Sequence, residues 1–281
     1  MTPLLDRICL VHDSATGVEA IRARFGAHAY DLHRHDDWLA GVTESGVQDF
    51  MCRGARRRST PGRVILIEPE EAHDGEAGAA GGFAYCMLYL PRPWLRAALP
   101  EAAAGEPGFS SCLCDDPFLA HAIRAACSAL FSRGERLVRE AALDAVLDHL
   151  RRHLGRPSRL RSGGRDERVA RLARERLHDD FGSDIGADAL AKAAGAADRF
   201  QLARAFRACY GTSPHAYLVQ LRLLRARRLL GAGVRPAKVA ADCGFADQSH
   251  LGRRFRRAYG LTPAAYRALR TDVPDAEGGI G

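Results

Sequence analysis

Several features that the chain lacks exclude whole classes of protein. Its 281 residues contain no apolar run of the roughly eighteen residues that a membrane span needs. Polar residues, beginning with Asp6, interrupt the start of the chain where a signal peptide would be apolar. The eight cysteines include no CxxC pair, which argues against a disulfide framework and a zinc ribbon. We therefore expect a cytoplasmic protein without a membrane segment.

Motifs of common enzymes are missing as well. The sequence has no GxSxG elbow, no phosphate-binding glycine loop and no HExxH. We expect no enzyme and no cofactor. A hydrophobic fraction of 47% and a charged fraction of 27% are typical of a globular chain, and the length suffices for two domains.

Positive charge is concentrated in the C-terminal half. Residues 161–281 carry 22 Lys and Arg against 13 Asp and Glu, a net charge of +9, whereas residues 1–160 carry −2 of the whole-chain charge of +7. A basic half of this kind is expected of a domain that faces nucleic-acid phosphates.

A repeat with a period of 49 residues organises this basic half. Residues 190–217 and 239–266 align without a gap and share thirteen identities in twenty-eight positions. Chance similarity of two Ala- and Arg-rich helices does not explain so many identities. The identical pairs include Gly195 and Gly244, Asp198 and Asp247, Phe206 and Phe255, and Pro214 and Pro263.

Each copy has the pattern of a helix, a turn and a second helix. Small apolar residues at helical spacing precede a glycine that can end the first helix, and an Asp follows where an N-cap acceptor is needed. An apolar pair four residues apart, Leu202 with Phe206 or Leu251 with Phe255, can then face the first helix. This pattern predicts a helix-turn-helix unit.

With these pairs facing inward, the opposite face of the second helix carries arginine in both copies. An arginine fork can bond O6 and N7 of guanine in the major groove. Solvated charge would explain one such helix, but its recurrence favours DNA contact. We expect Arg204 and Arg253 to reach base edges and Lys238 to meet a phosphate. The candidate DNA-binding residues are Arg199, Phe200, Arg204, Arg207, Lys238, Gln248, Ser249, Arg253 and Arg256.

The string GFADQSHLGRRFRRAYGLTPAAYR resembles the signature of the AraC/XylS family of bacterial transcription regulators, and RACYGTSPHAYLVQLRLLRARRLL resembles the first half of that signature. The resemblance covers about residues 188–269. It implies two helix-turn-helix units joined by a long helix over about residues 214–230, which bind successive major grooves. The first copy departs from the family pattern at Ala196-Ala197, in its turn.

The N-terminal half shows short apolar segments separated by glycine, which predict a small β-barrel or sandwich. LHRHDDW and PGRVILIEPEEAHDG resemble the cupin-like effector-binding domain of such regulators. The resemblance implies a pocket for a small polar or charged molecule, although Trp38 and Tyr85 also fit core packing. The expected strands are residues 8–11, 31–44, 47–52, 63–68 and 83–90; residues 20–25 fit a helical turn or a strand, and 75–82 a loop. The candidate effector-binding residues are His33, His35, Trp38, His73 and Tyr85.

In metal-binding cupins, a His-x-His pair, a nearby Glu and a later His converge on one ion. Here Asp36 and Asp37 come too early and Glu44 too late to supply the carboxylate. The sequence therefore favours neutral histidines in a pocket and no bound metal.

A helical segment follows the strands. Asp116 before Pro117 predicts an N-cap and a helix to about residue 132; Gly134 breaks it, and a second helix is expected to about residue 154. Leu137, Ala141, Val146, Leu147 and Leu150 recur on this second helix and are expected to face the barrel or another subunit. The family resemblance favours a homodimer through these helices.

The expected fold class is α+β, an N-terminal cupin-like β-barrel and a helical segment followed by an all-α domain. The expected boundaries are 1–95 for the sensor, 96–154 for the helical segment, 155–166 for a linker, 167–270 for the double helix-turn-helix and 271–281 for a frayed tail.

These expectations combine into a transcription regulator that binds promoter DNA sequence-specifically under control of a small-molecule effector. RNA polymerase is a further partner if the protein activates transcription. One alternative is a metal-dependent cupin enzyme with an accessory DNA-binding domain. Another is a nonspecific architectural DNA binder.

Overall fold

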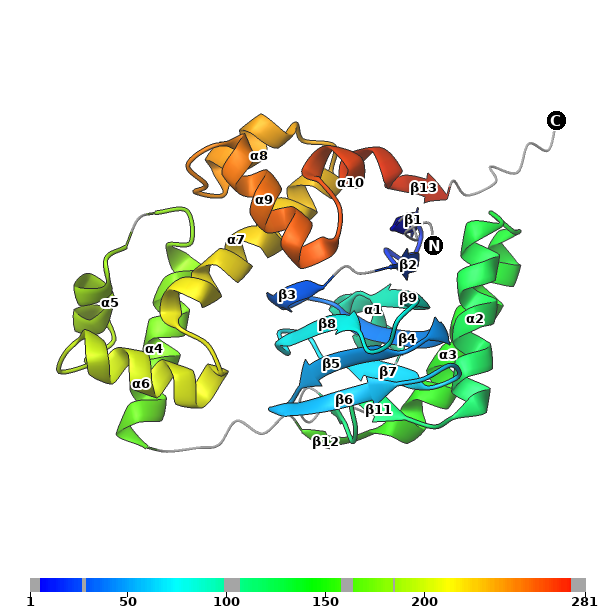
Figure 1. Cartoon of the computed structure of the whole chain (residues 1–281), viewed down its shortest axis with the longest axis horizontal. Coiled ribbons are helices and arrows are strands. Elements are labelled where there is room, and N and C mark those ends of the chain that lie inside the picture. Colours follow the sequence, from blue (N-terminus) through cyan, green and yellow to red (C-terminus); the bar gives the residue numbers. More distant parts are fainter. Residues whose placement is uncertain (1–5, 27–28, 99–106, 158–163, 184, 274–281) are drawn as a thin grey trace. The chain divides into compact units, whose positions relative to one another are not determined.

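The computed structural model describes residues 6–26, 29–98, 107–157, 164–183 and 185–273 (Figure 1). The chain divides into two compact units. One comprises Met1–Arg159 with Ala268–Gly281, and the other Leu160–Arg267. The first is rich in β-strands and the second is helical, which confirms the α+β class. In the described ranges, no helix is long and apolar enough to cross a bilayer.

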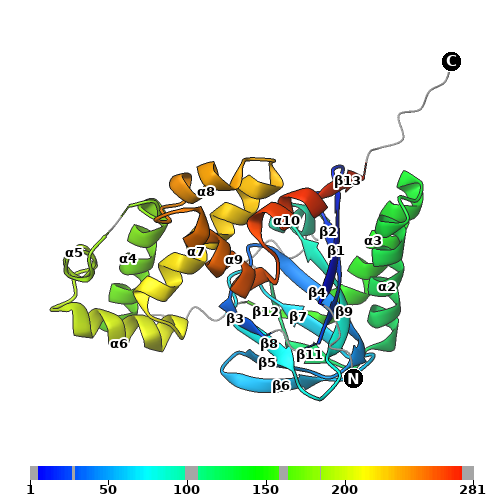
Figure 2. The same ribbon diagram turned by 45° about the horizontal axis from the view of Figure 1, so that its top comes forward.

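The N-terminal unit contains a seven-stranded and a four-stranded sheet (Figures 1 and 2). The larger sheet has the order β11-β7-β4-β9-β2-β1-β13 and the smaller β3-β8-β5-β6. The larger consists of β1 (Arg7–Asp13), β2 (Glu19–Phe25), β4 (Trp38–Gly46), β7 (Val64–Ile67), β9 (Phe83–Leu90), β11 (Leu113–Cys114) and β13 (Thr271–Val273). The smaller consists of β3 (Tyr30–His33), β5 (Gln48–Cys52), β6 (Ala55–Ser59) and β8 (His73–Ala77).

The two faces of the larger sheet have different neighbours because side chains alternate along each strand. One face packs against α2 (Pro117–Phe131), which contacts β1, β2, β4 and β9. Val42, Leu88 and Ile123 belong to one buried core on this side, together with Val146 of α3 (Arg136–Leu150). The opposite face is turned toward the smaller sheet, as the contact between Phe25 of β2 and Tyr30 of β3 indicates. The interior between the two sheets is therefore where β3 and β8 place their inward side chains.

Three β segments differ from the sequence expectation. The expected strand over residues 31–44 is two strands, β3 and β4. Residues 20–25, for which a strand was one of the two expected forms, lie in β2. The expected loop over 75–82 begins within β8, which ends at Ala77. The edge strand β6, with sequence ARRRS, lacks apolar alternation because its arginines are exposed, so hydrophobic periodicity could not reveal it.

The helical segment is largely as expected. Asp116 caps α2 by accepting hydrogen bonds from the backbone N–H groups of Phe118 (3.0 Å) and Leu119 (2.9 Å). The first helix after the strands, α1 (Arg92–Ala98), precedes α2.

The second helix of this segment, α3, ends at Leu150, earlier than expected. A 3₁₀ turn (Arg151–His153) and β12 (Leu154–Pro157) follow it, and β12 pairs with β10 (Pro107–Phe109). Val146, Leu147 and Leu150 are buried, whereas Leu137 and Ala141 lie on the exposed side of the helix. A strand partner distant in sequence stops this helix, and a local pattern cannot show that partner.

The helical unit is built from two similar halves. The first helix of each half, α4 or α7, leads to a pair of shorter helices. The helices are α4 (Arg165–Asp179), α5 (Ala187–Ala193), α6 (Arg199–Tyr210), α7 (Pro214–Gly231), α8 (Pro236–Asp242), α9 (Gln248–Tyr259) and α10 (Pro263–Leu269). The long helix expected over residues 214–230 is α7.

The structure differs from the expected domain boundaries at both ends of the helical unit. Of the expected linker over 155–166, residues 155–157 belong to β12 and α4 begins at Arg165, while 158–163 lie outside the described residues. The expected frayed tail is wrong for residues 271–273, which form β13 in parallel with β1. An edge strand offers unpaired backbone groups to any nearby segment, whatever its composition. Residues 274–281 lie outside the described part of the chain.

Candidate DNA-binding helices and sensor cluster

The two helix-turn-helix units match in the hydrogen bonds that begin their second helices. The carboxylate of Asp198 accepts from the backbone N–H of Gln201, and that of Asp247 accepts from the backbone N–H of His250, each at 2.6 Å. These N-caps satisfy donors that the first helical turn leaves without a partner. An aspartate N-cap with the same geometry therefore begins both α6 and α9.

The ends of these helices match as well. Gly211 and Gly260 adopt left-handed backbone conformations, with φ of 69° and 73°. Their N–H groups donate to the carbonyls of Arg207 (2.9 Å) and Arg256 (2.8 Å). A side chain at either glycine would strain this conformation, which explains why the repeat retains glycine.

Aromatic contacts fix the buried face of each second helix. Phe206 of α6 packs edge-on against Tyr217 (ring centroids 5.3 Å apart), and Phe255 of α9 packs in the same way against Tyr266 (5.5 Å). Both phenylalanines are fully buried. The opposite faces of α6 and α9 are therefore turned to solvent.

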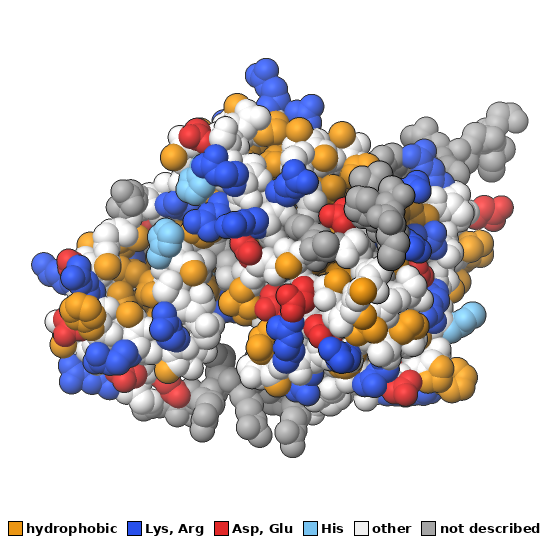
Figure 3. All heavy atoms as spheres, viewed as in Figure 1, with side chains coloured by type: hydrophobic (Ala, Val, Ile, Leu, Met, Phe, Trp, Pro, Cys, Tyr) orange, Lys and Arg blue, Asp and Glu red, His pale blue; other side chains and the backbone are white. Residues whose placement is uncertain are grey.

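All nine candidate DNA-binding residues from the sequence analysis have exposed side chains. Among the described residues, neither Arg204 nor Arg253 has an ion-pair partner. Phe200 is 61% exposed, and the guanidinium of Arg199 lies 5.1 Å from the centre of its ring. Lys238 forms a surface ion pair with Asp242 (Nζ to Oδ2, 3.1 Å), which is weak at such an exposed place. Lys and Arg side chains stand out on the surface of the helical unit (Figure 3).

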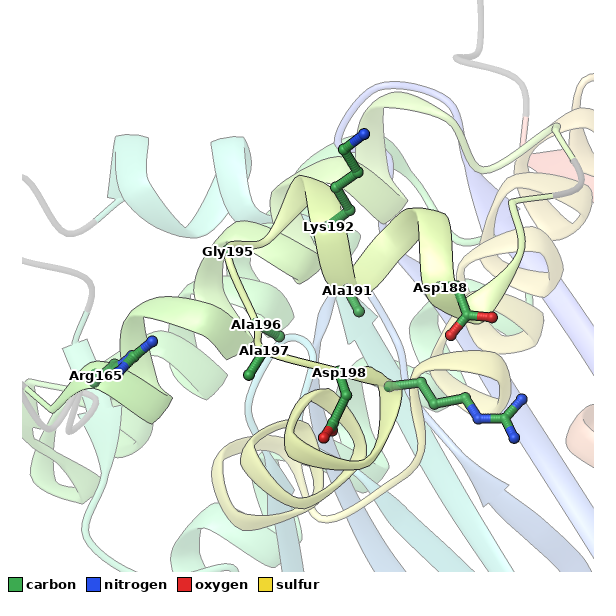
Figure 4. Close-up of a pocket in the computed structure, with 9 residues that line it drawn as sticks. Arg165, Asp188, Ala191, Lys192, Gly195, Ala196, Ala197 and Asp198 are labelled. Atoms are coloured by element: carbon green, nitrogen blue, oxygen red, sulfur yellow. The ribbon is translucent and has the colours of Figure 1, made fainter.

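The first unit has a hollow at its turn, with a volume of about 470 Å³ (Figure 4). In the second unit the buried Phe245 stands at the repeat position of Ala196. In the first unit, the small side chain of Ala196 therefore leaves the space beside the turn open. The lining residues include Arg165, Asp188, Lys192, Ala196, Asp198 and Arg199.

In the N-terminal unit, three histidines that are far apart in sequence come together. His33 ends β3 and pairs in register with His73, the first residue of β8, while His35 follows in the next loop. The ring centroids are 4.5 Å apart for His33 and His73, 4.9 Å for His33 and His35, and 5.1 Å for His35 and His73. All three side chains are buried.

Backbone carbonyls orient two of the rings. Nδ1 of His33 lies 2.7 Å from the carbonyl oxygen of Asp31, and Nδ1 of His73 lies 2.9 Å from that of Glu71. Because a carbonyl oxygen can only accept, each Nδ1 carries a proton, and in the neutral form of the ring each Nε2 holds the lone pair. Burial lowers the pKa of His73, although the Glu71 carbonyl opposes the shift, so the neutral ring is favoured.

Tyrosines line the space around the histidines. His35 meets Tyr89 edge-on with centroids 5.0 Å apart, and Tyr30 lies 5.7 Å from His33. The hydroxyls of Tyr30 and Tyr85 lie 3.1 Å apart, and burial raises the pKa of Tyr85 to about 12. The sequence pointed to Tyr85 but not to Tyr30 or Tyr89. The alternation of β9, which turns Tyr85 and Tyr89 to one face, was the available signal for Tyr89.

The structure does not bring Trp38 to this cluster. Trp38 shares a core with Val42 and the helices, on the opposite face of the larger sheet, and meets Phe109 with ring centroids 5.0 Å apart. The prediction that Trp38 lines the histidine pocket is therefore wrong. Its place in the strand, where neighbours alternate between faces, decides the side on which it lies.

Comparison with known proteins assigns both units. A family model described as the AraC-like ligand-binding domain matches residues 15–150, and a helix-turn-helix domain model matches residues 190–269. The chain is an AraC-type transcription regulator with a ligand-binding domain. The comparisons lend no support to a cupin enzyme or to an architectural DNA binder.

Relatives of this regulator agree with that assignment. It is 26% identical over 225 residues to the uncharacterized HTH-type transcriptional regulator YbfI of Bacillus subtilis, covering 79% of this chain and 82% of the relative. Crystal structures of ToxT from Vibrio cholerae resemble it in fold. The apo form of a ToxT variant has a TM-score of 0.57 at 12% identity, covering 96% of this chain and 99% of that chain. The wild-type form bound to an unsaturated fatty acid has a TM-score of 0.55 at 12% identity, covering 96% and 97%.

Proposed function

We propose that α6 and α9 read promoter DNA by entering successive major grooves, with Arg204 and Arg253 at base edges. The observation that carries this is the repeat of cap, buried aromatic and exposed arginine at the same positions of both units. Two helices held by the same contacts present their arginines in the same way. Such a pair favours recognition of two similar half-sites.

The remaining exposed residues have complementary roles in this proposal. Lys238 and the flanking arginines, Arg207 and Arg256, meet phosphates, which position the helices without reading sequence. Gln248 and Ser249, at the start of α9, offer hydrogen-bonding side chains to bases or backbone. Phe200, with the Arg199 guanidinium over its ring, offers an apolar surface for a thymine methyl group.

We infer that the effector binds in the interior between the two sheets. His33, His35 and His73 lie there with Tyr85, and these polar groups favour a small polar or charged effector. ToxT, which shares the fold, has been crystallised with an unsaturated fatty acid, a molecule with one charged end. For this regulator we infer effector binding without catalysis.

A homodimer completes the proposal. Three large apolar side chains of α2 and α3 are exposed: Phe118 (67%), Leu137 (75%) and Val138 (53%). Phe118 lies at the start of α2 and stacks on His149 near the end of α3, whereas Leu137 and Val138 lie at the start of α3. Exposed apolar side chains at both ends of this helix pair support an interface with a second copy. The regulator would act in the cytoplasm on promoter DNA, and it would contact RNA polymerase if it activates.

The test is selection of bound sites from genomic DNA, followed by binding measurements on the recovered site and a scrambled site. We expect a tenfold or larger preference, about 1.4 kcal/mol, for the recovered site at physiological salt. Equal affinity for both sites at all salt concentrations would leave a nonspecific DNA binder and overturn the proposal.

A further inference from the structure

We propose that His33, His35 and His73 form a binding site for one divalent transition-metal ion, for which Zn²⁺ is the probe. The site lies inside the N-terminal unit. The inference goes beyond the DNA-binding proposal and does not rest on it.

The geometry of the three rings is the first support. One ligand-capable nitrogen from each histidine lies within 4.8 Å of the other two. Ligands at the ordinary Zn–N distance of about 2.1 Å in tetrahedral geometry are about 3.4 Å apart, so modest side-chain rotation closes the set. The three ring centroids also lie only 4.5 to 5.1 Å from one another, which places the rings around one small space.

The orientation of the rings is the second support. In His33 and His73 the proton on Nδ1 is held by a backbone carbonyl, so Nε2 carries the lone pair that a metal needs. A carbonyl partner on the far nitrogen is the usual support of a metal-binding histidine, because it fixes tautomer and ring direction. Both carbonyls lie two residues before their histidines, at Asp31 and Glu71, and the two histidines pair across β3 and β8.

The donor set selects the class of metal. Imidazole suits zinc, copper, nickel and iron, whereas magnesium and calcium prefer oxygen. The carboxylate whose absence argued against a metal in the sequence is not required, since three imidazoles and one open position form a known zinc arrangement. Negative charge from Glu71 and Asp74 reaches His73, although Arg34 opposes it. The open position would accept water or a donor atom of the effector.

The experiment uses the full-length protein without a histidine tag, stripped with a chelator and titrated with Zn²⁺ by calorimetry. We expect one equivalent per chain and a higher midpoint of thermal unfolding with the metal. His33→Gln and His73→Gln should each weaken Zn²⁺ binding by about 100-fold or more. The matched control is His121→Gln, at an exposed position of α2, which should bind as the unmodified protein does.

Cobalt gives a second readout that does not depend on whether a variant folds. The eight free cysteines are competing ligands, and thiolate ligation would add a sulfur-to-cobalt charge-transfer band to the Co²⁺ spectrum. Imidazole ligation without that band supports the site. No binding, thiolate ligation, or equal affinity in His73→Gln would overturn it. Specific DNA binding by the stripped protein would leave the regulator function intact in any of these cases.

Discussion

Phe245 is buried in the turn of the second helix-turn-helix unit at the repeat position where the first unit has Ala196 beside a hollow of about 470 Å³. The same backbone frame therefore holds one filled and one open turn. The difference between the two side chains can be tested in both directions.

Filling the open turn should stabilise the protein. Ala196→Phe is expected to raise the free energy of unfolding by about 0.5 to 2 kcal/mol. Phe245→Ala should lower it by about 3 to 5 kcal/mol, because it opens a cavity. Urea unfolding followed by circular dichroism measures both, and Ala193→Phe, at an exposed place on α5, should change stability by less than about 0.5 kcal/mol. A loss of stability in Ala196→Phe would mean that the turn cannot admit a ring.

Arg253→Ala should weaken binding to the preferred site by about 1 to 3 kcal/mol and relax discrimination at one or two base positions, because a bidentate contact to a base edge is lost. Arg204→Ala should do the same in the neighbouring groove. Binding to the recovered and scrambled sites measures the effect, and Arg171→Ala on α4 is the control. If Arg253→Ala lowers both affinities equally, that arginine holds the DNA backbone instead.

Lys238→Ala should behave differently from the arginine variants. It should weaken cognate and scrambled DNA alike and lower the salt dependence of binding by about one unit of slope, because one phosphate contact is lost. A change in base preference would count against the phosphate assignment. The exposed ion pair of Lys238 with Asp242 should contribute little to the free energy of folding or of DNA binding, so Asp242→Ala serves as the control.

Two glycine substitutions should change stability in opposite directions. Gly211→Ala places a side chain at φ of 69° and should destabilise by about 1 kcal/mol, although there is open space around it. Gly252→Ala, inside α9 with equally open surroundings, should stabilise by about 0.5 to 1 kcal/mol through helix propensity. Thermal or urea unfolding measures both, and a stabilising Gly211→Ala would contradict the left-handed cap.

The Asp116 cap should give the N-terminal unit a specific acid sensitivity. Burial raises the pKa of Asp116, but the N–H of Leu119 and the His153 ring, 2.8 Å from the carboxylate, outweigh it and lower the pKa. A depressed pKa means that this stabilisation is present above the unfolded value of about 3.9 and is lost as pH falls through the folded value. Asp116→Asn should therefore be less stable than the unmodified protein at neutral pH, and the difference should shrink below about pH 4. Asp144→Asn, exposed on α3, is the control.

The sequence predicted the helical unit more fully than the sensor. Caps, glycines and apolar pairs in a repeat are local signals, and the structure places Gly195, Asp198 and their counterparts where those signals put them. In the sensor, the convergence of His33 and His73 depends on pairing between β3 and β8, and most of β8 falls where the sequence predicts a loop. The prediction for Trp38 is wrong because sequence proximity to the histidines says nothing about strand alternation.

The pairing of β13 with β1 affects how readily the protein self-associates through the edge of its larger sheet. Residues 271–273 cover the edge of the seven-stranded sheet with a strand only three residues long. Without β13, the backbone groups of Val11–Asp13 on this edge would be open to pairing with strands of other molecules. Residues 271–273 therefore influence the solubility of this regulator, although they follow both of its helix-turn-helix units in the sequence.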